Sequence, residues 1–155
     1  GITSEKEFEE RMEQYDNTML IRFPAKSENE GLARVAVTAF AAPLDPTVSE
    51  LTDMKTAVSE AVTNAIVHGY AKGTGDVEVF CQRKEETIYI MVSDKGCGIS
   101  DITQAMEPLY TSKPEQERAG LGFTIMETFM DSLEVESKVG EGTCVKMAKK
   151  LSKLR

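Results

Sequence analysis

Apolar residues recur along the chain with two different periods, and each period predicts one kind of element. Alternation of apolar and polar positions predicts a short strand at 19–23, a hairpin at 77–92 and two last strands at 133–137 and 143–147. Spacings of three and four residues instead predict helices. The two periods together indicate a protein that contains both kinds of element.

The first predicted helix has one apolar and one polar side. It begins at the capping-box pattern Ser27-Glu28-Asn29-Glu30 and ends before Pro43. Its apolar side comprises Leu32, Val35, Ala36, Ala39 and Phe40. On its polar side, Glu30, Arg34 and Thr38 lie four residues apart, so we expect this stripe to face solvent or a protein partner.

Two more helices follow from the same spacing. Thr52 or Asp53 is expected to cap the second helix, which ends at Gly69. The third helix is expected from Phe123 to Leu133. Residues 100–119 show little apolar periodicity, and so long a structureless connection is typical of a functional loop.

Three helices and about five strands in 155 residues fit one compact domain. Because consecutive strands occur in the second half of the chain, we expect an α+β fold. This fold is a two-layer α/β sandwich, with helices packed on one face of a mixed, mainly antiparallel sheet. We place the domain at 17–155 and interpret the Glu-rich residues 1–16 as an N-terminal extension.

Charge, cysteine content and hydropathy exclude several classes of protein. The 18 Lys and Arg against 26 Asp and Glu give a net charge of −8, the wrong sign for direct nucleic-acid binding. Cys81, Cys97 and Cys144 are odd in number and far apart, which fits a reducing compartment better than a disulfide framework. No apolar run approaches the roughly 20 residues of a membrane span, and no signal-peptide pattern opens the chain. We therefore expect a cytoplasmic protein without a membrane segment.

The commonest phosphate-binding motifs are absent. None of the four G-x-G triplets has the third glycine of a dinucleotide fingerprint, and no Gly-Lys pair marks a P-loop. His68 is followed by Gly69 and not by the Arg-Asp of a eukaryotic-type kinase loop. A bound nucleotide would need another architecture.

The second helix carries a polar stripe that suggests such an architecture. Glu60, Asn64 and His68 are four residues apart and therefore share one helix face. Asparagine is unfavourable inside a helix, so Asn64 suggests a use for its amide, such as an oxygen ligand for Mg²⁺. Glu60 could accept a proton from a hydroxyl group or water. An ordinary solvated helix face would show the same stripe.

Two glycine-containing segments offer the remaining parts of a nucleotide site. Asp94-Lys95-Gly96-Cys97-Gly98 directly follows a predicted strand, where a carboxylate could accept a hydrogen bond from adenine and Gly96 and Gly98 would let the ring approach, although a plain tight turn has the same pattern. Gly120-Leu121-Gly122 precedes a predicted helix, where free N–H groups could hold a phosphate, although a plain cap would look alike. Lys113 and Arg118 in the long loop could close over a triphosphate.

These parts, in this order, resemble the GHKL (Bergerat) superfamily of ATP-binding domains, which includes gyrase and the sensor histidine kinases. Residues 60–68 resemble its N box, and 94–98 and 120–122 resemble its two glycine boxes. Within the superfamily, residues 59–70 and 107–127 resemble the anti-sigma-F factors of spore-forming bacteria. The likeness extends over about residues 18–147.

The resemblance implies a role for each matching residue. Glu60 would be the catalytic base and Asn64 the Mg²⁺ ligand. Asp94 would contact adenine, and Arg118 would contact the γ-phosphate. Further nucleotide-binding positions would be His68, Gly96, Gly98, Thr111, Lys113, Gly120 and Gly122. Arg34 matches the arginine at which such factors contact both of their protein partners.

The resemblance also implies a function. Such a protein is a serine/threonine kinase that uses Mg²⁺ and ATP, holds a sporulation sigma factor inactive, phosphorylates a serine of an anti-anti-sigma protein, and forms a homodimer. The main alternative is a catalytically idle, nucleotide-gated sigma-binding module. The detached catalytic domain of a sensor histidine kinase is a weaker one, because residues 107–123 match the anti-sigma pattern better. A gyrase-like motor needs a further domain that 155 residues cannot hold.

Overall fold

The computed structural model describes residues 6, 10, 14–70, 75–98 and 114–152, and for 68, 69 and 114–119 it describes the backbone alone. Five strands form one sheet in the order β1-β2-β3-β5-β4, and all four of these pairings are antiparallel. The strands are β1 (Asn17–Pro24), β2 (Asp76–Lys84), β3 (Thr87–Asp94), β4 (Ser132–Lys138) and β5 (Gly142–Lys150). All the predicted strands and both predicted hairpins are therefore confirmed.

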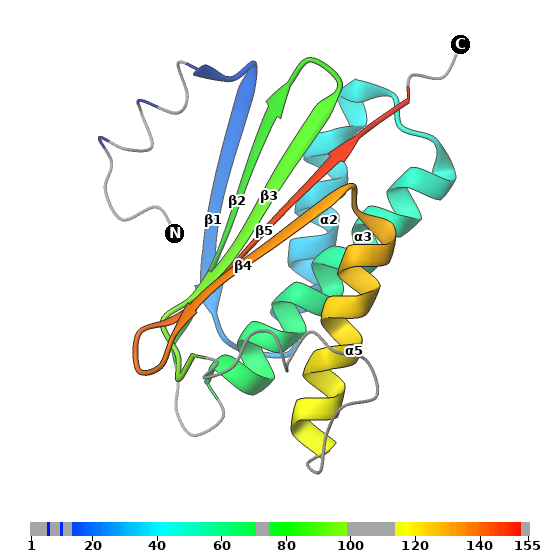
Figure 1. Ribbon diagram of the computed structural model, residues 1–155. Helices are drawn as coiled ribbons and strands as arrows, with labels where there is room; N and C mark the ends of the chain where they lie inside the picture. Colours follow the sequence, from blue (N-terminus) through cyan, green and yellow to red (C-terminus); the bar gives the residue numbers. More distant parts are fainter. Residues whose placement is uncertain (1–5, 7–9, 11–13, 71–74, 99–113, 153–155) are drawn as a thin grey trace.

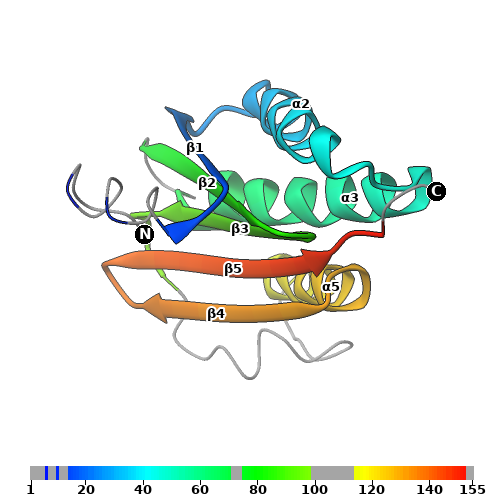
Figure 2. The same cartoon turned by 90° about the horizontal axis from the view of Figure 1, so that it is seen from above.

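The helices cover one face of this sheet, as Figures 1 and 2 show. They are α2 (Asn29–Ala41), α3 (Val48–Asn64) and α5 (Pro114–Phe129), with a short 3-10 turn, η1 (Ala42–Leu44), after α2 and a π-helical turn, η2 (Ala65–Gly69), after α3. Helix α2 contacts β1 and β2, α3 contacts β3, and α5 contacts β4. The expected two-layer α+β sandwich is confirmed.

The start of α3 differs from the prediction. The helix begins at Val48, and Thr47 caps it in place of Thr52 or Asp53. The Thr47 hydroxyl accepts a hydrogen bond from the Glu50 N–H at 3.1 Å, and the Glu50 carboxylate accepts one from the Thr47 N–H at 2.9 Å. This reciprocal capping box begins the helix five or six residues earlier than predicted.

Two predictions for α2 are wrong. Its N-cap is Glu28, which makes no side-chain capping bond, so the expected Ser27–Glu30 capping box does not form. Leu32 and Val35 are 54% and 68% exposed, although we expected them in the apolar face. The buried residues are Ala33, Val37, Phe40 and Ala41. The buried face of α2 therefore includes Phe40 as predicted, but it is centred on Ala33, Val37 and Ala41 and not on Leu32 and Val35.

The start of α5 also differs. The helix begins at Pro114, nine residues before the predicted Phe123. Proline suits the first turn of a helix because the N–H it lacks would have no intrahelical partner there. Gly120 and Gly122 therefore lie inside α5 and not before it, which matters for the phosphate prediction below.

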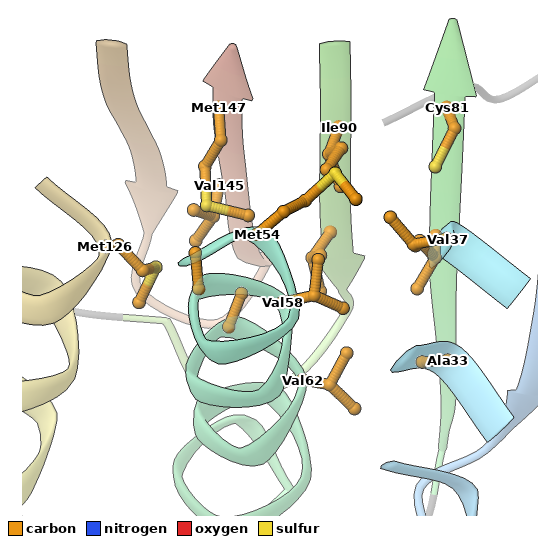
Figure 3. Packing of buried hydrophobic residues seen from close by; sticks show 14 of the residues in the cluster. Ala33, Val37, Met54, Val58, Val62, Cys81, Ile90, Met126, Val145 and Met147 are labelled. Atoms are coloured by element: carbon orange, nitrogen blue, oxygen red, sulfur yellow. The ribbon is translucent and has the colours of Figure 1, made fainter. Parts of the chain in front are cut away.

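The core lies between the sheet and the three helices. Figure 3 shows Met54, Val58 and Val62 on successive turns of α3. The same view shows Ile90 of β3 and Val145 and Met147 of β5 above that helix. The core residues that this view labels on α3, β3 and β5 are at most 4% exposed. Of the helices in the described ranges, none has both the length and the apolar character that crossing a membrane would take.

One charged side chain in this layer joins three elements, and its loss should be measurable. Lys149 of β5 is 9% exposed, donates to the Phe129 carbonyl oxygen at 2.7 Å and lies 4.0 Å from the Asp53 carboxylate. We expect Lys149→Met to lower the free energy of unfolding by about 1–3 kcal/mol, because it leaves the last carbonyl of α5 without this donor. Urea unfolding measures this, with the exposed neighbour Lys150→Met as control. Equal midpoints for the two variants would contradict the capping role.

Candidate functional site

The polar stripe of α3 meets a glycine of α5. Met54, Val58, Ala61 and Val62 turn into the core, so Glu60 and Asn64 lie on another side of α3, at the helix layer. A Cβ atom placed on Gly122 would lie 3.1 Å from Glu60 Oε2 and 3.0 Å from Asn64 Nδ2. The fold therefore brings Glu60, Asn64 and Gly122 to one place.

The environment of Glu60 favours its protonated form. Burial raises the pKa of this carboxyl above its ordinary value of 4.5, and the negative charge of Glu30 raises it further. A carboxylate with a raised pKa takes up a proton more readily, which suits a general base. Glu30 was not predicted to act here, because the sequence suggested a helix cap for it.

Asn64 is suited to hold a ligand. Its Nδ2 atom is buried and has no hydrogen-bond partner among the described residues. A buried amide without a partner is costly, and a bound ligand would complete its contacts. Mg²⁺ takes few protein oxygens and completes its shell with phosphates and water. The Asn64 carboxamide oxygen, beside a carboxylate, fits such a role, and no cluster of three or more His, Cys, Asp and Glu ligands occurs in the described ranges.

His68, which was predicted to continue this stripe, lies in the turn that follows α3, and its placement on the stripe stays a prediction. The α-helical spacing ends at Asn64, and residues 65–69 form a π-helical turn. The side chain of His68 lies outside the described part of the chain.

Asp94 ends β3 on the side of the sheet that faces the helices. It has the same parity as Ile90 and Val92, which lie in the core. Its Oδ1 atom accepts a hydrogen bond from the Gly96 N–H at 2.9 Å. Burial raises the pKa of the Asp94 carboxyl, while backbone hydrogen bonds from Gly96 and Thr143 act in the opposite direction. A half-buried carboxylate oriented in this way can accept a hydrogen bond from an amine.

Two glycines let the turn after Asp94 pack against the turn between β4 and β5. Gly98 has a φ of +74°, and a Cβ atom there would collide with the Lys138 carbonyl. Gly142 has a φ of +111°, and a Cβ atom there would collide with the Asp94 carbonyl. Both positions require glycine. The sequence predicted that Gly98 would let adenine approach, and it missed the close packing at both glycines.

Tyr70 is a second residue that sequence reasoning missed. Its hydroxyl accepts a hydrogen bond from the Lys95 N–H and donates one to the Asp76 carbonyl, both at 2.7 Å. It therefore ties the Asp94 turn to the start of β2. The signal in the sequence was an aromatic residue directly after the polar helix, with no partner implied.

The glycine pair of α5 does not form the predicted cap. Gly120 and Gly122 lie within α5, where backbone N–H groups bond to carbonyls one turn earlier and are not free for a phosphate. Arg118 lies on the same helix, and its side chain is outside the described part. Thr111 and Lys113 also lie outside the described residues.

Arg34 lies on the exposed side of α2, as predicted. Its Nε atom is 2.8 Å from Glu30 Oε1, and its side chain is 46% exposed. The Thr38 hydroxyl donates to the Arg34 carbonyl oxygen at 2.8 Å. Arg34 therefore presents an accessible cation that is held by a neighbour on its own helix.

A groove of about 650 Å³ is lined by residues of all five strands. Arg22, Glu78, Ser93, Glu136 and Cys144 in its wall belong to the sheet face opposite the helices. This wall mixes both signs of charge and lies across the sheet from Glu60. Tyr70 and Asp94 also line this groove, whereas Glu60 and Asn64 do not.

Comparison with known proteins agrees with this fold. Residues 23–149 match the family model for the histidine kinase-like ATPase domain. A solved structure of the RsbU and RsbW domains of a Mycobacterium tuberculosis protein is similar over 88% of this chain, with a TM-score of 0.65 and 20% identity. This chain covers 32% of that longer one, and the likeness supports the fold alone.

Curated relatives identify a group of proteins within this family that the chain closely resembles. The chain is 56% identical over 140 residues to an anti-sigma F factor of Clostridium kluyveri, covering 90% of this chain and 99% of that one. It is 58% identical to the anti-sigma F factor of Clostridium beijerinckii, covering 88% of this chain and 96% of that one. It is 59% identical to that of Clostridium perfringens, covering 88% and 99%. The chain therefore belongs to the histidine kinase-like ATPase domain family and, within it, to the anti-sigma F factors.

Proposed function

We propose that this anti-sigma F factor is a serine/threonine protein kinase that uses Mg²⁺ and ATP, inhibits a sporulation sigma factor and phosphorylates a serine of its anti-anti-sigma antagonist. The observation that carries the proposal is the meeting of Glu60 and Asn64 beside Gly122. The carboxylate has a raised proton affinity, and the amide lacks a partner among the described residues. A phosphoryl-transfer site needs a base and, close to it, a polar group that is available to bind a ligand.

The proposed reaction is in-line phosphoryl transfer. A bond forms between the serine Oγ atom and the γ-phosphorus, the bond from that phosphorus to the ADP oxygen breaks, and the serine proton passes to Glu60. Asp94 accepts a hydrogen bond from the adenine amine, and Arg118 offsets charge on the γ-phosphate. Mg²⁺, which Asn64 would hold, supplies further positive charge at the phosphate oxygens.

A catalytically idle, nucleotide-gated module is the main alternative, and the state of Glu60 argues against it. A module that only binds nucleotide and sigma factor gains nothing from the half-buried Glu60 carboxylate beside the Glu30 carboxylate. Keeping that charge costs folding free energy because burial disfavours the ionised form.

Incubation with labelled ATP, Mg²⁺ and the anti-anti-sigma protein distinguishes the two functions. A kinase transfers the γ-phosphate to a serine of that protein, which mass spectrometry locates. Tight ATP binding without any phosphoserine would favour the idle module.

Capture of the sigma factor should depend on Arg34. We expect Arg34→Ala to weaken the affinity for the sigma factor about tenfold, because an exposed cation that pairs with a partner carboxylate is lost. Arg22→Ala is a matched control, since Arg22 is an exposed arginine on the sheet that pairs with Glu78. Titration calorimetry measures the affinity, and equal affinities of the two variants would contradict this interface.

We also propose that the working unit is a homodimer, which analytical ultracentrifugation tests.

A further inference from the structure

The Glu30 carboxylate links two helices at the level of the candidate base. Its Oε1 atom accepts a hydrogen bond from the Ser59 hydroxyl of α3 and is 2.8 Å from Arg34 Nε of its own helix, α2. The Glu30 side chain is 21% exposed, so water reaches this group only in part. One oxygen therefore connects α3 with the exposed cation of α2.

This contact lies directly beside Glu60. Ser59 precedes Glu60 in α3, so a hydrogen bond that fixes the Ser59 side chain also fixes the helix turn that carries the base. Glu30 also acts on Glu60 through space, since its charge helps to raise the pKa of that carboxyl. Glu30 thus influences the base through a bond to its neighbour and through its charge.

We infer that Glu30 and Ser59 are positioning residues that transmit the docking of an acidic group of a protein partner at Arg34 to the base Glu60. This inference rests on the proposed function. The known resemblance assigns a role to Arg34 and to Glu60, and the structure supplies the two residues between them.

Glu30 makes two contacts, one with Arg34 and one with Ser59, and the weakness of the first explains how docking at Arg34 affects Glu60. The Arg34 side chain is nearly half exposed, and an ion pair in such a position is weak against water. A carboxylate of the partner can therefore replace Glu30 at Arg34 at little cost. Glu30 then keeps its bond to Ser59 but loses the cation that offsets its charge beside Glu60. Binding at Arg34 thereby changes the electrostatic environment of Glu60 without movement of either helix.

Variants at Ser59 test the link. We expect Ser59→Ala to lower the single-turnover rate of transfer to the anti-anti-sigma protein about tenfold, since small displacements of a reacting group are costly. The KM for that protein and the affinity for ADP should change less than twofold. Ser59→Thr keeps a hydroxyl and should restore most of the rate. Thr52→Ala is the control, because the Thr52 hydroxyl binds only the Val48 carbonyl within the same helix.

A double-mutant cycle tests whether Glu30 and Ser59 act together. Glu30→Gln keeps the shape and an acceptor oxygen, so the variant is expected to fold. If the two residues act as one link, the combined variant loses little more rate than either single variant. Fully additive losses, or a wild-type rate in Ser59→Ala, would overturn the inference. So would an equal loss of rate in Thr52→Ala.

A second measurement separates this inference from the proposed function. If the wild-type protein transfers no phosphate, the kinase proposal fails and the link is tested by hydrogen exchange. Loss of the bond between the helices should then speed amide exchange in residues 59–62 about fivefold in Ser59→Ala, and not in Thr52→Ala. Unchanged exchange would overturn the link itself.

Discussion

Replacing Glu60 with glutamine should lower the rate of phosphoryl transfer about 10²–10⁴-fold, the usual effect of removing a general base. Glutamine has nearly the same shape and should leave the packing beside Gly122 in place. The affinities for ATP and for the sigma factor should therefore stay close to those of the wild type. A single-turnover assay with labelled ATP measures the rate, and calorimetry measures the affinities.

The matched control is Glu127→Gln. Glu127 lies exposed on α5 and has no part in the site, so its variant should transfer phosphate at the wild-type rate. Unchanged transfer in Glu60→Gln would remove Glu60 from the mechanism. A parallel loss of ATP binding would assign it a role in binding in place of proton transfer.

The same substitution should also change stability with pH. Because the folded-state pKa of Glu60 is raised above 4.5, the folded protein holds this proton more tightly than the unfolded chain. Ionised Glu60 therefore costs stability above its raised pKa, and the cost disappears as the pH falls through that pKa toward the unfolded value. Glu60→Gln should be more stable than the wild type at pH 7, and the gain should vanish near pH 4. Thermal unfolding at both pH values measures this, and a gain that persists at low pH would contradict it.

The second large effect is expected at Asp94. A hydrogen bond to a charged group is worth about 1.5–3 kcal/mol, so Asp94→Asn should weaken ATP binding about 10–150-fold. Asparagine keeps an oxygen that can accept the Gly96 N–H, so the turn should keep its shape. Fluorescence titration with a labelled adenine nucleotide measures the loss.

Asp76→Asn controls for the change in net charge. Asp76 begins β2 beside the same turn, but its side chain is exposed. Its variant should bind ATP as the wild type does. If both variants lose affinity equally, general electrostatics and not a direct contact of Asp94 is responsible.

Patterns within one element were predicted well. The alternation in β2 and β3 identified both strands, because a half-buried strand must place apolar residues at every second position. The repeat from Met54 to Ile66 identified the core face of α3, and with it the polar position of Glu60 and Asn64. The glycines after Asp94 suggested an adenine pocket or a plain tight turn, and the positive φ of Gly98 fits a turn.

Helix boundaries and side-chain contacts between elements were predicted poorly. The sequence did not reveal that α5 begins at Pro114, because the local composition of 114–120 also suits a loop. Glu30 fits a capping box in the sequence, yet in the structure it bonds to Ser59, a residue 29 positions away. Neither outcome follows from local preference, because contacts with α3 compete with it.

The sequence by itself determined the element types, the two-layer class and the polar face that bears Glu60 and Asn64, because these depend on periods of two and 3.6 residues within short segments. Only the tertiary structure decided that Gly122 lies against those two side chains, that Gly98 and Gly142 let two turns pack together, and that Glu30 connects Arg34 with Ser59. The reason is physical: such contacts join residues far apart in the chain, and they form only where packing of the whole core brings their backbones close.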